Sequence, residues 1–227
     1  MSKESSTKPI LIAILRLVIG FPIIGLLFFW PAGTFDYWQA WLWLAILFLP
    51  LMGMFAYLIK RDPALLERRV RTGETRPEQK RIIAVSALYL ILIFLLPGLD
   101  KRFGWSSIPV WLVIVADALV LASFLLNFLV IRVNSYASRV VEVEQGQQVI
   151  TTGPYALVRH PMYLSIILIM LVTPLALGSY WGVIPSLAFI PLLAARAKNE
   201  EELLMNELAG YREYTQKTRY RLFPGIW

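Results

Sequence analysis

The chain has no cysteine and a single histidine, His160, among its 227 residues. Without cysteine it can form neither a disulfide nor a thiolate metal site, and the sequence does not indicate whether its compartment is oxidising or reducing. One histidine also excludes a histidine-rich metal centre. We therefore expect a protein without a bound metal.

The signatures of several enzyme classes are missing as well. The sequence contains no Walker A phosphate loop, no paired-histidine zinc motif and no G-x-S-x-G turn. No glycine-rich nucleotide loop follows a strand, so a nucleoside cofactor would have to bind in a manner unlike that of the Rossmann fold. No internal repeat or low-complexity tract divides the chain, and we expect one domain, residues 1–227.

Apolar sequence is abundant: 58% of the residues are hydrophobic and the mean hydropathy is +0.62. Such a composition is typical of membrane proteins rather than of soluble domains. The net charge of +7 would favour a nucleic-acid partner in a soluble protein. Here the basic residues lie between apolar runs, which indicates contact with anionic membrane lipids and no nucleic-acid partner.

Four apolar runs in the first part of the chain are long enough to cross a bilayer. They are residues 9–30, 38–59, 82–99 and 108–131. A basic connector, residues 60–81, separates the second run from the third, and its part from 63 to 71 is expected to form a short surface helix. The first eight residues form a polar start without the features of a removable signal peptide.

Two shorter apolar runs follow, residues 162–177 and 181–195. Each would be about 23 Å long as a helix, which is short for a full crossing. We expect a tight, partly buried helical hairpin, after which residues 196–227 leave the membrane as an amphipathic tail. The predicted fold is an all-α, polytopic integral membrane helical bundle, with four spans in residues 1–131 and a catalytic part in residues 132–227.

Arg16, Asp117 and Asn127 are polar residues inside the predicted spans. Arg16 is near one end of its span, where a long side chain can reach the interface. An ionisable residue at membrane depth often has a function, but we expect Asp117 to serve structure, either by neutralising Arg16 or by accepting a neighbouring hydroxyl's proton.

The 22 lysines and arginines predict the orientation of the bundle. With the N-terminus in the cytosol, 19 of them lie in cytosolic segments, whereas Lys101 and Arg102 lie outside and Arg16 lies within a span. Positive residues are enriched in the cytosolic loops of membrane proteins. We therefore expect both termini, and the segment between the fourth span and the hairpin, to face the cytosol.

That segment contains the stretch EQGQQVITTGPYALVRHPMY, residues 144–163, whose glycines and prolines favour turns over a helix. It can be a plain connection or a binding loop. In favour of binding, Pro161 suits the first turn of a helix whose free N–H groups can meet a polar ligand, and His160 and Tyr163 add hydrogen-bonding groups. In the alternative interpretation, Arg159 and His160 contact lipid headgroups.

A second charged cluster contains Arg196, Glu200 and Glu201. Arg196 and Glu200 are four residues apart and so share one helical face, where they can form a solvated ion pair. Alternatively, the arginine binds an acidic substrate and the glutamate binds a cofactor. Farther on, Tyr211 and Tyr214 can either line a ligand site or anchor the chain at the membrane interface.

Five features follow one another within residues 140–227: the stretch VITTGPYALVRHPMY, the apolar hairpin, and the stretches RAKNEEELL, GYREY and RLFPGIW. In this order they resemble the isoprenylcysteine carboxyl methyltransferase family. This family belongs to a wider group of membrane methyltransferases that includes phospholipid N-methyltransferases. The first four spans match only as hydrophobic segments. The resemblance implies that S-adenosylmethionine is the cofactor and that it binds on the cytosolic side, beneath the C-terminal hairpin.

The family's functional residues carry over to named positions of this sequence. The resemblance implies a cofactor site made of Glu142, Gln147, Gln148, Val149, Ile150, Tyr155, His160, Pro161, Met162, Tyr163 and Glu200. It also implies that Arg196 is the catalytic residue that binds the substrate. Ser165 stands where many members have glycine, and the loop before Gln147 is shorter than in eukaryotic members. The resemblance therefore does not determine the identity of the methyl acceptor.

The chemistry implied by the resemblance suits these residues. Methyl transfer from a sulfonium is an in-line displacement, so positioning supplies much of the catalysis. A carboxylate acceptor needs an orienting cation, whereas an amine would need a base such as His160 or a glutamate. We expect carboxyl O-methylation of an isoprenylcysteine-like lipid. Phospholipid amine methylation, small-thiol methylation and a non-catalytic scaffold or transporter are the alternatives.

The predicted orientation can be tested with cysteine tags, because the chain has no cysteine of its own. Tags placed near Lys3 and near Lys217 should not react with a membrane-impermeant thiol reagent in intact cells, since both sites are expected to be cytosolic. A tag near Lys101 should react strongly. Strong labelling at either of the first two sites would show that the orientation is wrong.

Overall fold

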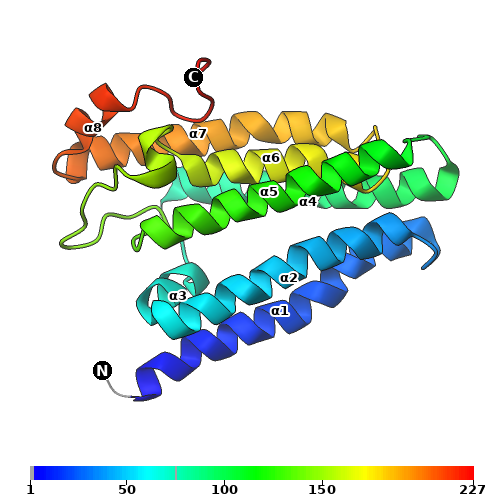
Figure 1. Cartoon of the computed structure of the whole chain (residues 1–227), viewed down its shortest axis with the longest axis horizontal. Coiled ribbons are helices and arrows are strands. Elements are labelled where there is room, and N and C mark those ends of the chain that lie inside the picture. Colours follow the sequence, from blue (N-terminus) through cyan, green and yellow to red (C-terminus); the bar gives the residue numbers. More distant parts are fainter. Residues whose placement is uncertain (1–2, 75) are drawn as a thin grey trace.

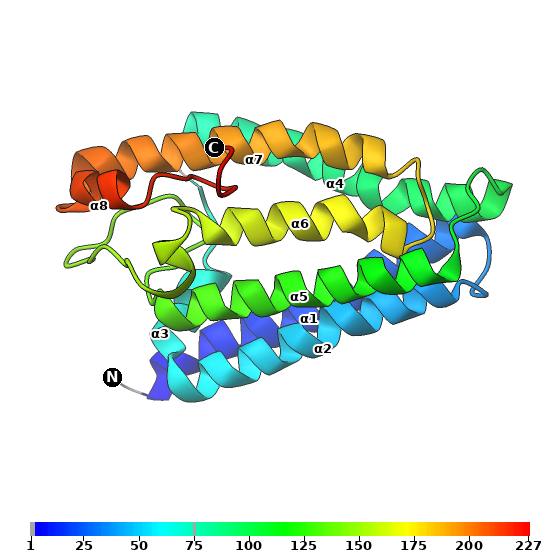
Figure 2. The same ribbon diagram turned by 45° about the horizontal axis from the view of Figure 1, so that its top comes forward.

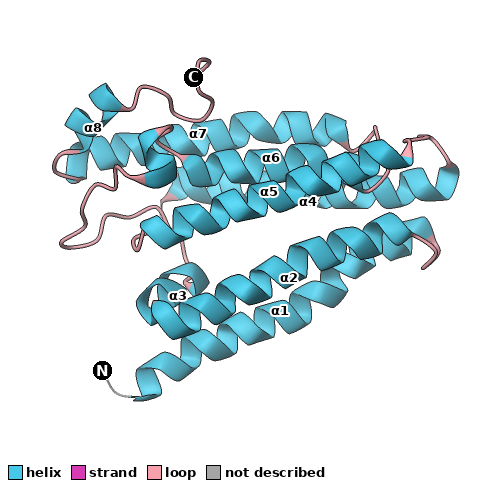
Figure 3. Ribbon diagram, viewed as in Figure 1, coloured by secondary structure: helices cyan, strands magenta, loops and turns pink. Residues whose placement is uncertain are grey.

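The computed structural model describes residues 3–74 and 76–227, and every regular element within them is a helix (Figures 1 and 3). The helices are α1 (Lys3–Ala32), α2 (Trp38–Arg61), α3 (Pro63–Val70), α4 (Pro77–Phe103), α5 (Val110–Val133), α6 (Pro161–Ala176), α7 (Val183–Glu207) and α8 (Tyr211–Lys217). A 3₁₀ turn, η1 (Gly153–Ala156), precedes α6. The predicted all-α bundle is confirmed.

The helices form two groups, as Figures 1 and 2 show. α1 and α2 pack together and both contact the short helix α3, while α5 packs along α6, and α6 along α7. α4 contacts α1 as well as α6 and α7, so it joins the two groups. The start of α1, α3, the segment 134–160 and α8 lie at one end of the bundle (Figures 1 and 2).

Four helical segments have the length and composition of membrane spans: Thr7–Ala32, Trp38–Arg61, Pro77–Phe103 and Val110–Val133. Large apolar side chains, such as Leu11, Leu49 and Trp111, are exposed on their outer faces. Lipid tails solvate such a surface, whereas a soluble protein of this size rarely exposes so much of it. The chain is therefore a multi-pass membrane protein, as expected.

Three helices extend well beyond the predicted runs. α4 is Pro77–Phe103, where residues 82–99 were expected. α1 begins at Lys3 instead of residue 9, so the expected polar start, where it lies within the described residues, is helical and Pro9 lies inside the helix. α7 runs on to Glu207, because residues 196–207 consist mostly of strong helix formers. The residues expected on a separate tail, Arg196 and Glu200 among them, therefore stand on the second helix of the hairpin.

α1 and α4 approach each other closely at Gly98. A Cβ atom on this residue would lie 2.5 Å from the carbonyl oxygen of Phe28 and 3.0 Å from the Cβ of Pro31. A small residue is required where two helix backbones meet in this way. Beside the contact, the rings of Phe28, Trp43 and Phe94 pack edge to face and fill the core between α1, α2 and α4.

At the end of the bundle away from α8, the carboxylate of Asp100 fixes the turn of the hairpin. It accepts hydrogen bonds from the backbone N–H and the hydroxyl of Ser106, both at 2.6 Å, and from the hydroxyl of Ser179 at 2.5 Å. Asp100 and Ser179 are buried. The network ties the α6–α7 turn to α4 and to the start of α5.

The polar residues inside the spans are arranged differently from expectation. Asp117 is buried, and neither of its carboxylate oxygens has a hydrogen-bond partner among the described residues. Arg16 donates instead to the carbonyl of Val70 at 2.7 Å, because it lies toward the α3 end of the bundle whereas Asp117 lies in the opposite half of α5. The expected pairing of Asp117 is therefore wrong.

Asn127 has a structural partner. Its side-chain amide donates to the hydroxyl of Ser165 at 2.8 Å, across the contact between α5 and α6. Ser165 is fully buried. Ser165 therefore fits into the contact between α5 and α6 and adds a hydrogen bond to it.

We predict that Gly98→Ala destabilises the bundle, because the added methyl group would overlap the backbone oxygen of Phe28, which moves only with α1. Overpacking of this kind costs about 1–3 kcal/mol and should lower the midpoint of thermal unfolding of the protein in detergent. Gly53→Ala is the matched control, since no atom lies within 4 Å of the added Cβ. An unchanged midpoint in Gly98→Ala would contradict the close contact.

Candidate functional site

A polar cleft of about 90 Å³ lies at the α3 and α8 end of the bundle. Eleven of the twelve residues implied by the family resemblance line it: Glu142, Gln147, Gln148, Val149, Ile150, Tyr155, His160, Met162, Tyr163, Arg196 and Glu200. Pro161 does not line the cleft; it is the buried first residue of α6. The structure brings these residues together, while their roles in binding stay predictions.

Tyr163 joins the two charged residues that face the cleft. Its hydroxyl donates to Oε2 of Glu200 at 2.5 Å and accepts from Nε of Arg196 at 3.1 Å. Tyr163 belongs to α6 and its two partners to α7, so the packing of the hairpin sets this geometry. A buried phenol bridges the two charges in place of the solvated ion pair that their spacing allowed.

Arg196 is also held from the side of the covering loop, residues 134–150, which lines the cleft. Its Nη2 donates to the carbonyl of Arg139 at 2.9 Å and lies 3.8 Å from Oε2 of Glu74. The same glutamate oxygen accepts from the backbone N–H of Val141 at 3.2 Å. Arg196 therefore connects the hairpin to the segment between α3 and α4 and to the loop at 139–141.

Glu201 lies behind the cleft, in a buried group of charges. Nη2 of Arg159 is 3.0 Å from its Oε1, and Nε of Arg221 donates to its Oε2 at 2.7 Å. Burial alone would raise the pKa of Glu201, but the neighbouring His160, Arg221 and Arg159 lower it below its ordinary value. Arg159 and His160 are both buried, so the interpretation that they contact lipid headgroups is wrong.

The residues after α8 hold the Arg159–His160 segment in place. The backbone N–H groups of Arg159 and His160 donate to the carbonyls of Tyr220 and Arg221, both at 2.9 Å. The guanidinium Nη1 of Arg159 also donates to three carbonyls of the tail, those of Thr215, Thr218 and Arg219. The tail is thus part of the site's framework and not a separate surface segment.

The imidazole of His160 is buried at the start of α6. Its Nε2 lies 3.6 Å from Oε2 of Glu201, beyond hydrogen-bond distance, and has no hydrogen-bond partner among the described residues. A buried polar atom without a partner is unfavourable and uncommon. This nitrogen faces Glu201, behind the cleft, and His160 itself is one of the residues that line the cleft.

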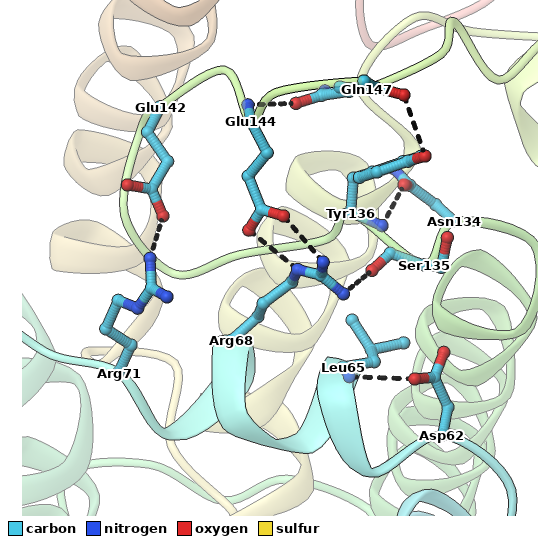
Figure 4. A network of polar contacts seen from close by, with 11 residues as sticks. Asp62, Leu65, Arg68, Arg71, Asn134, Ser135, Tyr136, Glu142, Glu144 and Gln147 are labelled. Atoms are coloured by element: carbon cyan, nitrogen blue, oxygen red, sulfur yellow. Dashed lines mark hydrogen bonds and ion pairs between the residues drawn. The ribbon is translucent and has the colours of Figure 1, made fainter. Parts of the chain in front are cut away.

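α3 fixes the loop that covers the cleft, as Figure 4 shows. Arg68 forms a bidentate pair with Glu144, at 2.7 and 2.6 Å, and donates to the carbonyl of Ser135 at 3.0 Å. Arg71 pairs with Glu142 at 2.8 Å. The hydrogen bonds from Arg68 lower the pKa of Glu144. Glu142, a predicted cofactor contact, is therefore already paired at the rim of the cleft.

Tyrosines form one wall of the cleft. Tyr214 donates to the carbonyl of Tyr155 at 2.7 Å, and the hydroxyl of Tyr155 accepts from Asn134 at 2.7 Å. Tyr211 and Tyr214 are buried, so they are not interfacial anchors. Burial raises the pKa of Tyr214 to about 12, so its hydroxyl stays protonated at neutral pH.

Two arginines near the cleft were missed by sequence reasoning. Arg139 lines the cleft from the covering loop, and Arg69 reaches it from α3, with Nη1 3.2 Å from the sulfur of Met162. The signal for Arg69 was its position on the apolar face of α3, one turn after Leu65. No pattern in the loop sequence marked Arg139.

A family model described as phospholipid methyltransferase matches residues 111–212. The matched range begins in α5 and includes the covering loop, both helices of the hairpin and the start of α8. It therefore contains every residue predicted for the cofactor and substrate sites. No curated protein matches the chain significantly.

The fold is similar to a solved structure of the eukaryotic intramembrane Ras methyltransferase, isoprenylcysteine carboxyl methyltransferase, without a monobody. The TM-score is 0.51 at 15% sequence identity, and the match covers 98% of this chain and 94% of that chain. At this identity the likeness concerns the fold. The family model and the fold together confirm the predicted resemblance: residues 111–212 match the phospholipid methyltransferase family, and the chain as a whole has a fold similar to that of isoprenylcysteine carboxyl methyltransferase.

Proposed function

We propose that this chain is an S-adenosylmethionine-dependent methyltransferase that methylates the carboxyl group of an isoprenylcysteine-like lipid. The observation that carries the proposal is the hydrogen-bonded series Arg196–Tyr163–Glu200 on the wall of the cleft. It holds a cation and a carboxylate on either side of one hydroxyl group. Both charges lie beside residues of the family's cofactor motif.

The side chains of the cleft suit the chemical groups of the cofactor. Glu200 offers a carboxylate to an ammonium group or to ribose hydroxyls. The hydroxyl of Tyr211 is buried without a partner among the described residues, so it can hydrogen-bond a bound polar group, and His160 also lines the cleft. The rings of Tyr155 and Tyr163 can face a sulfonium cation.

The covering loop has to move when the cofactor binds. The cleft encloses about 90 Å³, whereas small-molecule sites typically enclose about 300 Å³ or more. The ion pairs that hold the loop closed, Arg68–Glu144 and Arg71–Glu142, are partly exposed to solvent. An exposed ion pair such as Arg71–Glu142 contributes little to stability, whereas the bidentate and less exposed Arg68–Glu144 pair is the contact that opening the loop has to break.

When bound, S-adenosylmethionine supplies a methyl group carried by a sulfonium. A carboxylate acceptor is ionised at neutral pH, so the protein needs no general base and has to hold the acceptor oxygen in line with the methyl group. Arg196 is placed for this task, because Tyr163 and the carbonyl of Arg139 fix two sides of its guanidinium. A planar guanidinium can bind a carboxylate through two hydrogen bonds.

The charges around the cleft favour an anionic acceptor over an amine. Arg196 and Arg139 line the cleft and Arg69 adjoins it, whereas the lining holds one glutamate, Glu200, that is not paired with an arginine among the described residues. Glu142, Glu74 and Glu201 are each paired with an arginine. A cationic amine would be repelled by this excess of positive charge. Phospholipid amine methylation and small-thiol methylation are therefore less well supported than carboxyl methylation.

We place the cleft on the cytosolic side. The helix ends that surround it belong to the end of the bundle where the distribution of positive residues puts the cytosol. S-adenosylmethionine is soluble in water and would arrive from this side. A lipidic acceptor would enter sideways from the membrane lipids, between the spans.

The purified protein in detergent should bind S-adenosylmethionine or its demethylated product, and His160→Ala and Glu200→Ala should each weaken that binding. Loss of one hydrogen bond to a buried or charged group corresponds to about 1–3 kcal/mol, or roughly 5- to 150-fold in affinity. Isothermal titration calorimetry measures this directly. Glu202→Ala is the matched control, because that carboxylate is exposed on the same helix. Unchanged affinity in both variants would rule out this cleft.

Arg196→Lys should lower kcat/KM for the acceptor by roughly ten- to a hundredfold and leave cofactor affinity nearly unchanged. A lysine keeps the charge but cannot reproduce two parallel hydrogen bonds to a carboxylate, a loss of about 1.5–3 kcal/mol. The measurement is methyl incorporation from labelled cofactor into a prenylcysteine. Lys198→Gln, at an exposed position two residues away, serves as control. Wild-type turnover, or loss of cofactor binding instead, would assign Arg196 a different role.

A further inference from the structure

A second cavity, of about 540 Å³, lies between the two groups of helices. Apolar side chains of α1, α2, α4, α5 and α6 line it, and Arg69 is the one charged residue on its wall among the described residues. Gly53 and Leu125 belong to the wall and are exposed, so the cavity opens to the lipid-facing surface between α2 and α5. Its volume suits a small molecule with a hydrocarbon chain.

The direction of Arg69 follows from the packing of α3. Leu65, Leu66 and Val70 are buried and define the inner face of this helix, and Arg69 lies on the same face one turn after Leu65. The preceding residue, Arg68, is turned by about 100° and pairs with the covering loop (Figure 4). One short helix thus directs one arginine to the loop and the next to the cavity.

Arg69 has few hydrogen-bond acceptors around it for a cation in an apolar wall. Among the described residues its only hydrogen-bond partner is the sulfur of Met162, a weak acceptor, at 3.2 Å. Burial and the charge of Arg139 lower the pKa of Arg69 to about 10, so it stays protonated at neutral pH. Because Met162 also lines the cleft, Arg69 stands where the cavity and the cleft meet.

We propose that Arg69 binds the anionic headgroup of the methyl acceptor while the acceptor's hydrocarbon chain occupies the cavity. The occupant is an amphiphile with one carboxylate and an apolar chain, and this assignment rests on the proposed function. A cation that lacks a counter-ion in an apolar wall strongly favours an anion over an uncharged or cationic group. Arg69 is therefore the residue that selects acidic acceptors.

Arg69 and Arg196 have different roles in binding the acceptor. The donors of Arg196 are partly used by Tyr163 and by the carbonyl of Arg139, and Glu74 lies close to it. The donors of Arg69, apart from one, have no protein acceptor among the described residues. Arg69 thus contributes affinity for the headgroup as it arrives from the membrane side, and Arg196 contributes its orientation within the cleft.

The test compares N-acetyl-S-farnesylcysteine with its uncharged methyl ester, by equilibrium binding to the purified full-length protein in detergent. Wild type should bind the carboxylate at least tenfold more tightly than the ester, as expected for a charge-assisted hydrogen bond. Arg69→Gln should reduce this preference by weakening binding of the carboxylate alone and leave the part that Arg196 contributes, and Arg69→Lys should reduce it less. Arg61→Gln, at an exposed arginine at the end of α2, should keep all of it.

A second comparison separates the contribution of the headgroup to binding from that of the hydrocarbon chain. Gly53→Leu places a side chain in open space on the cavity wall and should weaken the carboxylate and the ester equally. Binding of S-adenosylhomocysteine, measured for every variant, reports whether the cleft is intact. It should be unchanged in Arg69→Gln.

Each other outcome overturns a stated claim. A carboxylate preference that is undiminished in Arg69→Gln, or a loss of S-adenosylhomocysteine binding in that variant, overturns the assignment of Arg69. A wild-type protein that binds S-adenosylhomocysteine but does not prefer the carboxylate overturns the acidic acceptor and leaves the methyltransferase proposal standing. A wild-type protein that does not bind S-adenosylhomocysteine overturns the proposed function itself.

Discussion

The buried carboxylate of Glu201 is the constraint on which the site depends. A charge removed from water is tolerated only when it is paired and hydrogen-bonded. Glu201 meets this requirement with Arg159, which precedes α6, and with Arg221, which follows α8. The carboxylate thereby draws together three segments that are far apart in the sequence, and they form the framework behind the cleft.

The same constraint sets the rotation of α7. Consecutive residues of a helix point about 100° apart, so once Glu201 faces Arg159, its neighbour Glu200 must face elsewhere. In this structure Glu200 faces the cleft and accepts from the hydroxyl of Tyr163. Two adjacent glutamates therefore have different tasks: one holds the framework and the other offers a free carboxylate oxygen to a ligand.

Local patterns in the sequence were sufficient to predict the spans and the segment that forms the cleft. Long apolar runs leave a bilayer little alternative to helices, and Pro161 marks the start of α6. The errors arose where a side chain's partner is distant in the sequence. The pairing of Arg159 with Glu201 spans about forty residues and depends on the tail's path, which no local pattern specifies. Asp117 was expected to pair with Arg16, but the two lie toward opposite ends of the bundle.

The arginines of the basic connector, residues 60–81, have more than one role. Its arginines were interpreted as a topology signal, and that interpretation treats them as equivalent. The structure distinguishes them by the face of α3 on which they lie: Arg68 holds the covering loop, whereas Arg69 lies at the wall between the polar cleft and the apolar cavity. An enzyme that joins a water-soluble donor to a lipidic acceptor needs such a boundary, because neither substrate dissolves well in the other's compartment. A cation at the boundary lowers the energy of an acidic headgroup there without requiring the hydrocarbon chain to leave the membrane.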